Sequence, residues 1–429
     1  MPPEENPTDI KGIKICLASQ SFYPYVGGVS YYLYYLSQEF LRRKCEVYEV
    51  HLGKPHMPSE EVVEGVKVYR VGVGNKKEDW NRYSSFKEKL YEQIHGLRAE
   101  GEWNREGYEE FIKFNKAIAS RVTQLCSDKK IDIVNPHDWQ LHLTPDYLDF
   151  SVPVVYTWHV PFTNKMGDEL GKQAAARLKK CDKVVFSVEE FLNHAKSLGV
   201  PEEKLVCIHP FVDLSRFDLD KGEGYRYKKD KGIPLDSEIV LCVARIDPVK
   251  SHEELLKAFS IIKKERRNAK LVCVGNGSIS NDVLGIRAQR KAKIMRLIRE
   301  LDLERDTIFL GHVPHKDIPK VYRMADVVVL PSKMEGFGLS LTEAMAAEKP
   351  VVAYNVGGIG TQIEHGFNGF LIEKGNFEEL AEKTCELLSN AELKRIMGKR
   401  AKQVVEKKFD VRKAVDKYLR LYQDVINRR

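Results

Sequence analysis

The sequence predicts an α/β protein with two parallel-sheet domains, and three observations support this prediction. The chain has 429 residues, 43% of them hydrophobic, which is enough for two cores at ~100–200 residues per domain. Short apolar runs alternate with longer amphipathic stretches, as in parallel sheets covered by helices on both faces. One polar stretch near the middle interrupts this alternation, so we expect one sheet on each side of it.

The apolar runs give the expected strands in order. In the first half they are residues 13–18, 47–52, 66–71, 131–135, 152–158, 183–188 and 205–208. In the second half they are residues 239–244, 271–274, 308–310, 327–330 and 351–354. Each run is short and rich in Val, Ile, Leu or Cys, which is typical of buried strands.

The polar interruption defines the expected domain boundaries. Residues 214–237 are polar and contain glycine without an apolar period, which is typical of a linker. They separate an N-terminal domain, 1–213, from a C-terminal domain, 238–410. In residues 411–429, apolar side chains recur every three or four positions, which predicts a final helix.

Two segments look like insertions into this pattern. Residues 75–107 carry several aromatic side chains among many charges, and residues 276–302 are long and basic. The aromatic segment could stack on a sugar, contact a membrane surface or form a plain amphipathic helix.

Composition narrows the class of protein. The net charge is 69 − 62 = +7, with both signs spread along the chain. This argues weakly against a nucleic-acid-binding protein, which would favour a dense basic stripe. No apolar run approaches the ~20 residues of a membrane-spanning helix, and the polar start does not resemble a secretory signal. The eight cysteines include no C-x-x-C pair, so we expect reduced thiols, no zinc site and a cytoplasmic protein.

The first candidate site follows the first strand. Gly27 and Gly28 precede an expected helix, and glycines at a helix start let backbone amides approach a phosphate. The segment lacks the G-x-G-x-x-G spacing of dinucleotide-binding proteins. An ordinary glycine turn remains the alternative.

Two histidines end strands of the first half. His159 closes the run 152–158, and His137, followed by Asp138, holds the matching place on the preceding strand. Ligands of open parallel sheets bind outside the carboxyl ends of the strands. Either histidine could therefore donate to a substrate oxygen, or be purely structural.

Two cations follow the first strand of the second half. Arg245 and Lys250 lie between the run 239–244 and an expected helix. An arginine fork and a lysine point charge at this place suit a diphosphate. Solvated surface cations are the alternative.

The strongest pattern is the segment EGFGLSLTEAM at residues 335–345. Gly336 and Gly338 predict a tight loop, and Leu339 begins a helix whose first amides have no intrahelical acceptor. A phosphate on those amides, with Glu335 and Glu343 accepting from hydroxyls on either side, matches the layout of a sugar nucleotide. Two unrelated surface carboxylates are the alternative.

Four segments together resemble a known family, the retaining glycosyltransferases of family four. They are ARIDPVKSHEELLKAF, GHVPHKDIPKVYRMADVVVLPS, EGFGLSLTEAMAAEKPVVA and NVGGIGTQIEHGFNGFLI. The resemblance covers nearly the whole chain and implies the GT-B fold, in which two Rossmann-like domains face each other across a cleft. It also implies that the final helix crosses back to the N-terminal domain.

The resemblance assigns roles to matching residues. Arg245 and Lys250 would bind the donor diphosphate. Glu335 would face the donor sugar and Glu343 the ribose, as the glutamates of an E-x7-E motif. His159 matches the family's histidine near the donor sugar and the acceptor. The expected catalytic residues are His159, Glu335, Arg245 and Lys250.

The remaining site residues follow from the same resemblance. The family's Gly-x-Gly loop is present at Gly275, and base recognition uses backbone groups around Val313. The expected donor-binding set is Gly27, Gly28, Arg245, Lys250, Gly275, Val313, Glu335, Gly336, Phe337, Gly338, Leu339 and Glu343. Acceptor candidates are Tyr25, His137 and Asp138.

The implied activity is transfer of a hexosyl group from a nucleoside-diphosphate sugar to an acceptor hydroxyl, with retention of the anomer. The cations can replace a divalent metal, so neither a metal nor a cofactor is expected. We expect a small soluble acceptor; a lipid-linked or polymeric glycan is the alternative, with peripheral membrane contact. A phosphorylase or a sugar-nucleotide epimerase is a further alternative, and the donor base could be uracil, guanine or adenine.

Overall fold

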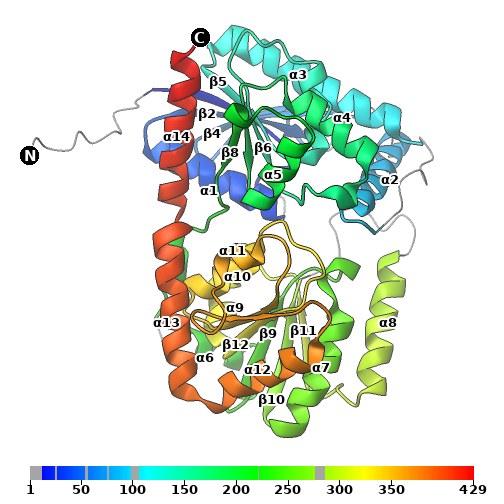
Figure 1. Cartoon of the computed structure of the whole chain (residues 1–429), viewed down its shortest axis with the longest axis vertical. Helices are drawn as coiled ribbons and strands as arrows, with labels where there is room; N and C mark the ends of the chain where they lie inside the picture. Colours follow the sequence, from blue (N-terminus) through cyan, green and yellow to red (C-terminus); the bar gives the residue numbers. More distant parts are fainter. Residues whose placement is uncertain are drawn as a thin grey trace, which may run out of the picture. The chain divides into compact units, whose positions relative to one another are not determined.

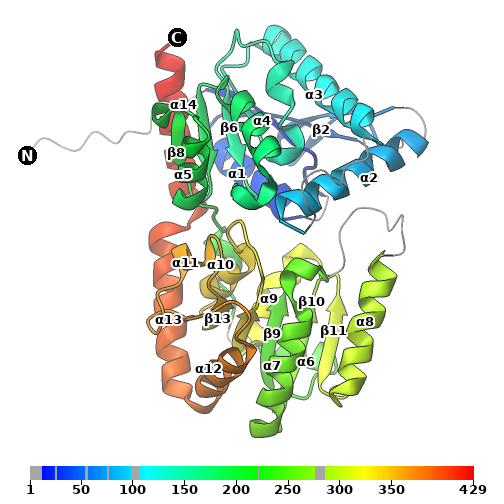
Figure 2. The same ribbon diagram turned by 45° about the vertical axis from the view of Figure 1, so that its right-hand side comes forward.

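The computed structural model describes residues 12–24, 27–53, 57–74, 77–97, 106–220, 222–275 and 286–429. The chain forms two compact units (Figures 1 and 2). The first unit comprises Met1–Pro210 together with Val411–Arg429, and the second comprises Phe211–Asp410.

The first unit contains a five-stranded sheet of order β3-β4-β2-β1-β5. Its strands are β1 (Lys14–Ala18), β2 (Glu46–Leu52), β3 (Glu60–Val63), β4 (Val66–Val71) and β5 (Ile133–Pro136). All pairs are parallel except β3 with β4. The interior strands are almost wholly buried, which explains their continuous apolar sequence.

Three more parallel strands continue this sheet. They are β6 (Val155–Trp158), β7 (Lys183–Phe186) and β8 (Leu205–Cys207), in that order. Isolated parallel bridges join Val134 to Val154 and His137 to Thr157. These bridges bring the carboxyl ends of β5 and β6 side by side.

Helices cover both faces of the first unit (Figure 1). They are α1 (Gly28–Arg42), α2 (Lys77–Ile94), α3 (Tyr108–Lys129), α4 (Asp168–Leu178), α5 (Glu189–Ser197) and α14 (Val411–Asn427). The aromatic segment 75–107 supplies α2, in which Tyr83 and Phe86 are 0% and 3% exposed. Both rings pack against Phe111 of α3, so the plain amphipathic helix describes this part of the segment.

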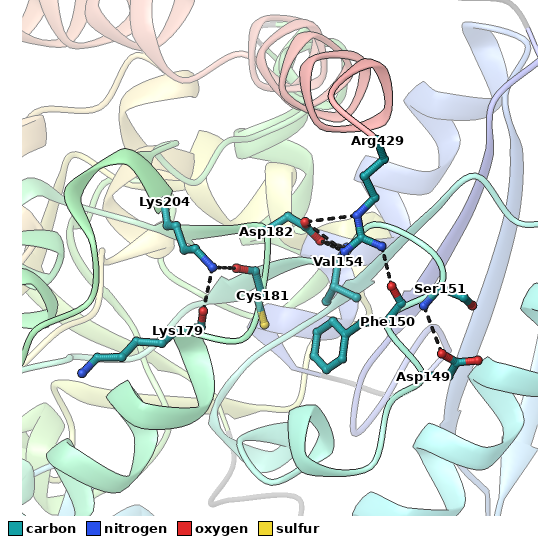
Figure 3. A network of polar contacts seen from close by, with 9 residues as sticks. All are labelled: Asp149, Phe150, Ser151, Val154, Lys179, Cys181, Asp182, Lys204 and Arg429. Carbon is teal, nitrogen blue, oxygen red and sulfur yellow. Dashed lines mark hydrogen bonds and ion pairs between the residues drawn. The ribbon is translucent and has the colours of Figure 1, made fainter.

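The last helix, α14, is fixed to the first unit by specific contacts. Tyr418 OH lies 2.9 Å from Tyr32 OH of α1, and Asp416 accepts a 2.6 Å hydrogen bond from Arg43. Figure 3 shows the end of the chain, where the Arg429 guanidinium donates to both carboxylate oxygens of Asp182 at 3.0 Å. Asp182 in turn accepts from the Val154 amide ahead of β6, so the contact anchors the chain end to the sheet.

The second unit is built on a six-stranded parallel sheet of order β11-β10-β9-β12-β13-β14. Its strands are β9 (Glu238–Val243), β10 (Ala269–Val274), β11 (Thr307–Gly311), β12 (Val327–Leu330), β13 (Val351–Tyr354) and β14 (Phe370–Ile372). Numbered from β9, the order is 3-2-1-4-5-6, that of the doubly wound dinucleotide-binding fold. The core between this sheet and its helices consists of apolar side chains that are almost completely buried.

Eight helices accompany this sheet in the described part of the second unit. They are α6 (Glu223–Asp230), α7 (His252–Glu265), α8 (Ile286–Glu300), α9 (Ile318–Met324), α10 (Leu339–Ala346), α11 (Ile359–Gln362), α12 (Phe377–Ser389) and α13 (Ala391–Lys408). Of the basic segment 276–302, residues 276–285 lie outside the described residues, and the rest begins with α8. No helix in the described ranges combines the length and apolar character needed to cross a membrane.

The structure differs from the sequence predictions at three places. Residues 214–237 contain a short 3₁₀ turn, Leu214–Phe217, and the helix α6. This helix belongs to the second unit, because a Cβ on Gly224 would stand 2.7 Å from the Arg323 carbonyl. The strands β3 and β14 were not expected; they have four and three residues, too few to show a period.

Candidate active site

The strand order of the second unit locates its ligand site. Doubly wound sheets bind ligands outside the carboxyl ends of the strands where the order reverses, here between β9 and β12. Arg245 and Lys250 follow β9, and the loop from Glu335 to Gly338 follows β12. The two segments are joined by a 2.7 Å hydrogen bond from the Lys333 amide to the Val249 carbonyl.

The segment after β9 is held by a side-chain cap. Asp247 accepts from the Val249 amide at 3.0 Å and begins a 3₁₀ turn that ends at Lys250. Arg245 is 40% exposed, and its Nη2 lies 3.7 Å from Asp247 Oδ2. Both expected diphosphate ligands therefore lie on one short, capped segment.

An ion pair crosses from this segment to the loop after β12. Lys250 Nζ lies 2.5 Å from Glu335 Oε1, and the side chains are 19% and 9% exposed. The loop backbone is confined as well. A Cβ at Gly357, which has φ +49°, would stand 2.0 Å from the Glu335 carbonyl oxygen, so only glycine permits this approach.

The loop after β12 ends at a helix start. Gly338 adopts a left-handed conformation with φ +91° and caps α10. Gln362 of α11 donates to the Phe337 carbonyl and accepts from Thr342 Oγ1 at 2.6 Å. The amides at Leu339 and the next residue thus sit at a rigid helix N-terminus, which favours an anion.

Glu343, one turn into α10, is held by two residues of the second unit. Tyr322 OH donates to Glu343 Oε2 at 2.9 Å, and Arg216 Nη1 lies 3.8 Å from Oε1. Burial raises the pKa of Glu343, while the Arg216 charge and the tyrosine hydrogen bond oppose that rise. Sequence analysis missed Arg216, which lies at the start of the expected linker and is only 13% exposed.

Two further donor-site candidates lie at the same edge of the sheet. Gly275, the residue after β10, has φ +131°, and a Cβ there would stand 2.4 Å from the Ala244 carbonyl oxygen. Its amide donates to the Gly311 carbonyl at 2.9 Å. Val313, between β11 and α9, is 7% exposed. Gly275 therefore packs the segments after β9, β10 and β11 closely together.

In the first unit, the glycine loop precedes α1. Gly27 is the N-cap of this helix and accepts from the Tyr31 amide at 3.1 Å. Gly28 has open space where a Cβ would stand, so sterics alone do not require glycine there. Tyr25, an acceptor candidate, lies outside the described residues.

The two histidines of the first unit form a pair. His137 Nδ1 lies 3.0 Å from His159 Nε2, with the ring planes 14° apart, a geometry that suits one N–H···N hydrogen bond. Tyr32 contacts His159 edge to face at 4.6 Å. Burial lowers the pKa of His159 to about 3 and that of His137 well below its usual range, so both rings are neutral at neutral pH.

Asp138 completes this group. Its backbone has φ +72°, a strained conformation that clusters at functional sites. Its Oδ1 accepts from the His159 amide at 3.2 Å, and burial raises the pKa of its carboxyl to about 6. The structure thus groups His137, Asp138 and His159 in the first unit, and the expected residues after strands β9 to β12 in the second.

Comparison with known families assigns this arrangement. A model described as Glycosyl transferases group 1 matches residues 225–404, and a model described as Glycosyltransferase Family 4 matches residues 26–216. The two matches together span most of both units. The chain belongs to glycosyltransferase family 4. The family expected from the sequence is thereby confirmed.

Individual relatives agree with this assignment. The glycosyltransferase is 27% identical over 324 residues to N-acetyl-alpha-D-glucosaminyl L-malate synthase of Bacillus anthracis, covering 74% of this chain and 81% of that protein. It is 28% identical over 314 residues to trehalose synthase of Thermococcus litoralis, covering 72% and 73%.

A solved structure shows the same fold. Sucrose-phosphate synthase from Thermosynechococcus elongatus matches with a TM-score of 0.79 and 20% identity, covering 97% of this chain and all of that one. The predicted α/β fold with two Rossmann-like sheets, GT-B, is confirmed.

Proposed function

We propose that this glycosyltransferase moves a hexosyl group from a nucleoside-diphosphate sugar to a hydroxyl of a small soluble acceptor, with retention of the anomer. The observation that carries the proposal is the Lys250–Glu335 pair. It places a cation and a carboxylate together at the reversal of strand order in the second unit, beside the N-terminus of α10.

Each group in that arrangement has a task in binding the donor. Lys250 and Arg245 neutralise the diphosphate, to which the α10 amides also donate. With Lys250 on a phosphate oxygen, the Glu335 carboxylate is released to accept from hydroxyls of the donor sugar. Glu343 accepts from hydroxyls of the ribose.

The chemistry then needs charge stabilisation at the leaving group. The bond from the sugar anomeric carbon to the phosphate oxygen breaks, and a bond to the acceptor oxygen forms on the same face. The acceptor proton goes to the departing phosphate oxygen, which gives a glycoside and a nucleoside diphosphate. Preorganised donors at a developing anion are worth about 2.7–4 kcal/mol each, by analogy with oxyanion holes.

The acceptor proposal rests on the first unit and on the relatives. The neutral His137–His159 pair offers hydrogen bonding without net charge, which suits a hydroxyl. We assign His159 to the reacting hydroxyls and His137 and Asp138 to the acceptor. The matched proteins are named as synthases of a glucosaminyl malate, of trehalose and of sucrose phosphate, all small molecules.

We further propose that no divalent metal is required and that the protein is cytoplasmic. Arg245 and Lys250 supply the positive charge that a metal would bring to the diphosphate. The free thiols of the eight cysteines suit a reducing compartment. Activity that persists in excess EDTA would support metal independence, and activity lost in EDTA and restored by Mg²⁺ or Mn²⁺ would overturn it.

A donor screen followed by product analysis tests the proposal. Thermal unfolding is measured with UDP-, GDP- and ADP-glucose, because a ligand at 100 times its dissociation constant adds about 2.7 kcal/mol of stability. The stabilising donor is then incubated with malate, glucose, fructose 6-phosphate and glycerate, and the new linkage is assigned by proton NMR.

An α-linked product of one of these acceptors supports the proposal, whereas a β-linked product would overturn retention. Isomerisation of the donor when it is incubated alone would indicate an epimerase. Glucosyl transfer only to a lipid extract or to a polymer would overturn the proposal that the acceptor is a small soluble molecule.

A further inference from the structure

One carboxylate of the second unit, Glu343, has both its oxygens engaged. Tyr322 OH donates to Oε2 at 2.9 Å, and the Arg216 guanidinium faces Oε1 at 3.8 Å. Tyr322 is fully buried and Arg216 nearly so. The Glu343 side chain therefore has a fixed orientation before any ligand arrives.

The other side of the Arg216 guanidinium reaches a different segment. Its Nη2 donates to the His315 carbonyl at 2.7 Å. His315 begins the 3₁₀ turn that leads into α9, two residues after Val313. Because the guanidinium is planar and its donors are fixed in a fork, Arg216 links the carboxylate on α10 to the connection between β11 and α9.

The residues around Arg216 hold it in this position. Asp213 accepts from both the amide and the hydroxyl of Ser215, at 3.1 and 2.6 Å, and so caps the short turn that carries Arg216. The next residue, Phe217, is 4% exposed and lies 6.2 Å from the Tyr322 ring. One turn thus positions Arg216 and also supports Tyr322, the second partner of Glu343.

The charge of Arg216 affects the chemistry of Glu343. Burial raises the pKa of this carboxyl, and Arg216 is the largest opposing influence. An ionised carboxylate only accepts hydrogen bonds, whereas a protonated one also donates. Without Arg216, Glu343 would take up a proton at higher pH and would lose acceptor strength toward hydroxyls.

We propose that Arg216 is a positioning residue for nucleotide recognition, which holds Glu343 for the ribose hydroxyls and ties it to the segment at Val313. This inference rests on the proposed function, because it takes a nucleoside diphosphate as the ligand of the second unit. It adds Arg216, from the turn Leu214–Phe217 near the start of the second unit, to the residues proposed for donor binding.

Calorimetric binding separates this role from a purely structural one. The full-length wild type, Arg216→Ala and Arg216→Lys are titrated with UDP, GDP and ADP, and with the 2′,3′-dideoxy form of the diphosphate that binds. We expect Arg216→Ala to weaken the ribose form about tenfold or more, as for a hydrogen bond involving a charged group. The dideoxy form should be weakened far less, and Arg216→Lys should be intermediate for the ribose form.

Two controls accompany the titrations. Arg226→Ala removes an exposed arginine of the neighbouring helix α6, which pairs with Asp220 and Glu223, and should leave both affinities unchanged. On a Glu343→Gln background, Arg216→Ala should add little, because the two residues act through the same contact. As the pH is lowered, the affinity of Arg216→Ala for the ribose form should also fall sooner than that of the wild type, because Arg216 opposes the raised pKa of Glu343.

The outcomes distinguish a failure of the positioning role of Arg216 from a failure of the proposed function. Equal weakening of the ribose and dideoxy forms by Arg216→Ala, or full additivity with Glu343→Gln, would overturn the positioning role and leave the proposed function standing. If Arg216→Ala fails to fold, Arg216→Lys is judged by the same ratio of affinities. A wild type that binds no nucleoside diphosphate would overturn the proposed function and, with it, this inference.

Discussion

The two units share a parallel α/β architecture, yet the groups at the carboxyl ends of their strands differ in charge. In the first unit, burial keeps His137 and His159 neutral and raises the pKa of Asp138 to about 6. In the second, Lys250 pairs with Glu335, and Arg216 faces Glu343. The two histidines at the sheet edge of the first unit are thus neutral, whereas the corresponding edge of the second unit is built from ion pairs.

This difference matches the two kinds of substrate in a glycosyl transfer. A diphosphate leaving group gains charge as the glycosidic bond breaks, so it requires preorganised cations. An acceptor hydroxyl is neutral, so it can be bound by hydrogen bonds from uncharged groups such as the two histidines. This comparison supports our proposal that the donor binds to the second unit and the acceptor to the first, and four changes test that proposal.

The largest effect is expected at Lys250. Replacing Lys250 with alanine removes the positive charge that stabilises the departing diphosphate. This change should lower kcat about 10²–10³-fold. Lys264→Ala, an exposed lysine of α7, is the matched control and should retain wild-type turnover. Steady-state kinetics with the preferred donor, alongside thermal unfolding, measure both. A Lys250→Ala enzyme with undiminished kcat would remove the basis for placing the donor here.

The next effect concerns the backbone of the Glu335 loop. Gly357→Ala puts a Cβ against the Glu335 carbonyl, 2.0 Å away in the present structure, so the loop must shift. We expect kcat to fall at least about tenfold, because small displacements of a positioned group are costly. Gly375→Ala is the control, since it has a similar left-handed φ of +92° with open space around it. Equal activities of the two variants would show that the loop position does not matter.

The third prediction uses the neutral histidines of the first unit. The pKa of His137 is lowered by burial, so below about pH 6.5 the unfolded chain binds a proton that the folded chain does not. Stability should therefore fall with decreasing pH, by about 1.4 kcal/mol per pH unit for each such histidine.

A variant isolates the contribution of His137. His137→Asn retains a polar group near Nδ1 but has no ring to protonate. The free energy of unfolding is measured with urea at pH 6.5 and 5.5. It should fall less in His137→Asn than in the wild type, and the difference is the free energy linked to the one proton that His137 binds on unfolding. Identical pH dependence in both proteins would mean that His137 is charged in the folded state.

The smallest effect is expected at α14. Tyr418→Phe removes a hydroxyl that lies 2.9 Å from Tyr32 OH and 3.3 Å from Thr157 Oγ1, which should cost about 1 kcal/mol of stability. Affinity for a nucleoside diphosphate should not change, because these contacts lie in the first unit. Tyr225→Phe, at a tyrosine 57% exposed, serves as the control. A weakened nucleotide affinity in Tyr418→Phe would contradict the division of tasks.

The features of the molecule that depend on local sequence patterns could be predicted from the sequence. Continuous apolar runs predicted the buried strands. Unusual residues after those runs pointed to Lys250, Glu335 and the histidines, which the structure brings together in two groups; their roles in the reaction stay predictions. Such positions can be inferred because parallel strands place their carboxyl ends at one edge.

Other parts depend on packing between distant segments, which no local pattern records. Arg216 lies in a polar stretch typical of a linker, and only the fold brings it to Glu343, 127 positions later in the chain. The helix α6 was missed for a similar reason: it has few apolar residues, and its Gly224 packs against the backbone of Arg323 and Met324 in α9. Likewise, the contact between Gly357 and the Glu335 carbonyl joins loops that follow different strands.

The preference for a diphosphate over a monophosphate tests the central claim most directly. Wild type and Lys250→Ala are titrated calorimetrically with UDP and UMP, or with the guanine or adenine pair if that base is the one bound. The account predicts that the wild type binds the diphosphate at least about tenfold more tightly and that Lys250→Ala loses most of this preference. An undiminished preference in Lys250→Ala would contradict it.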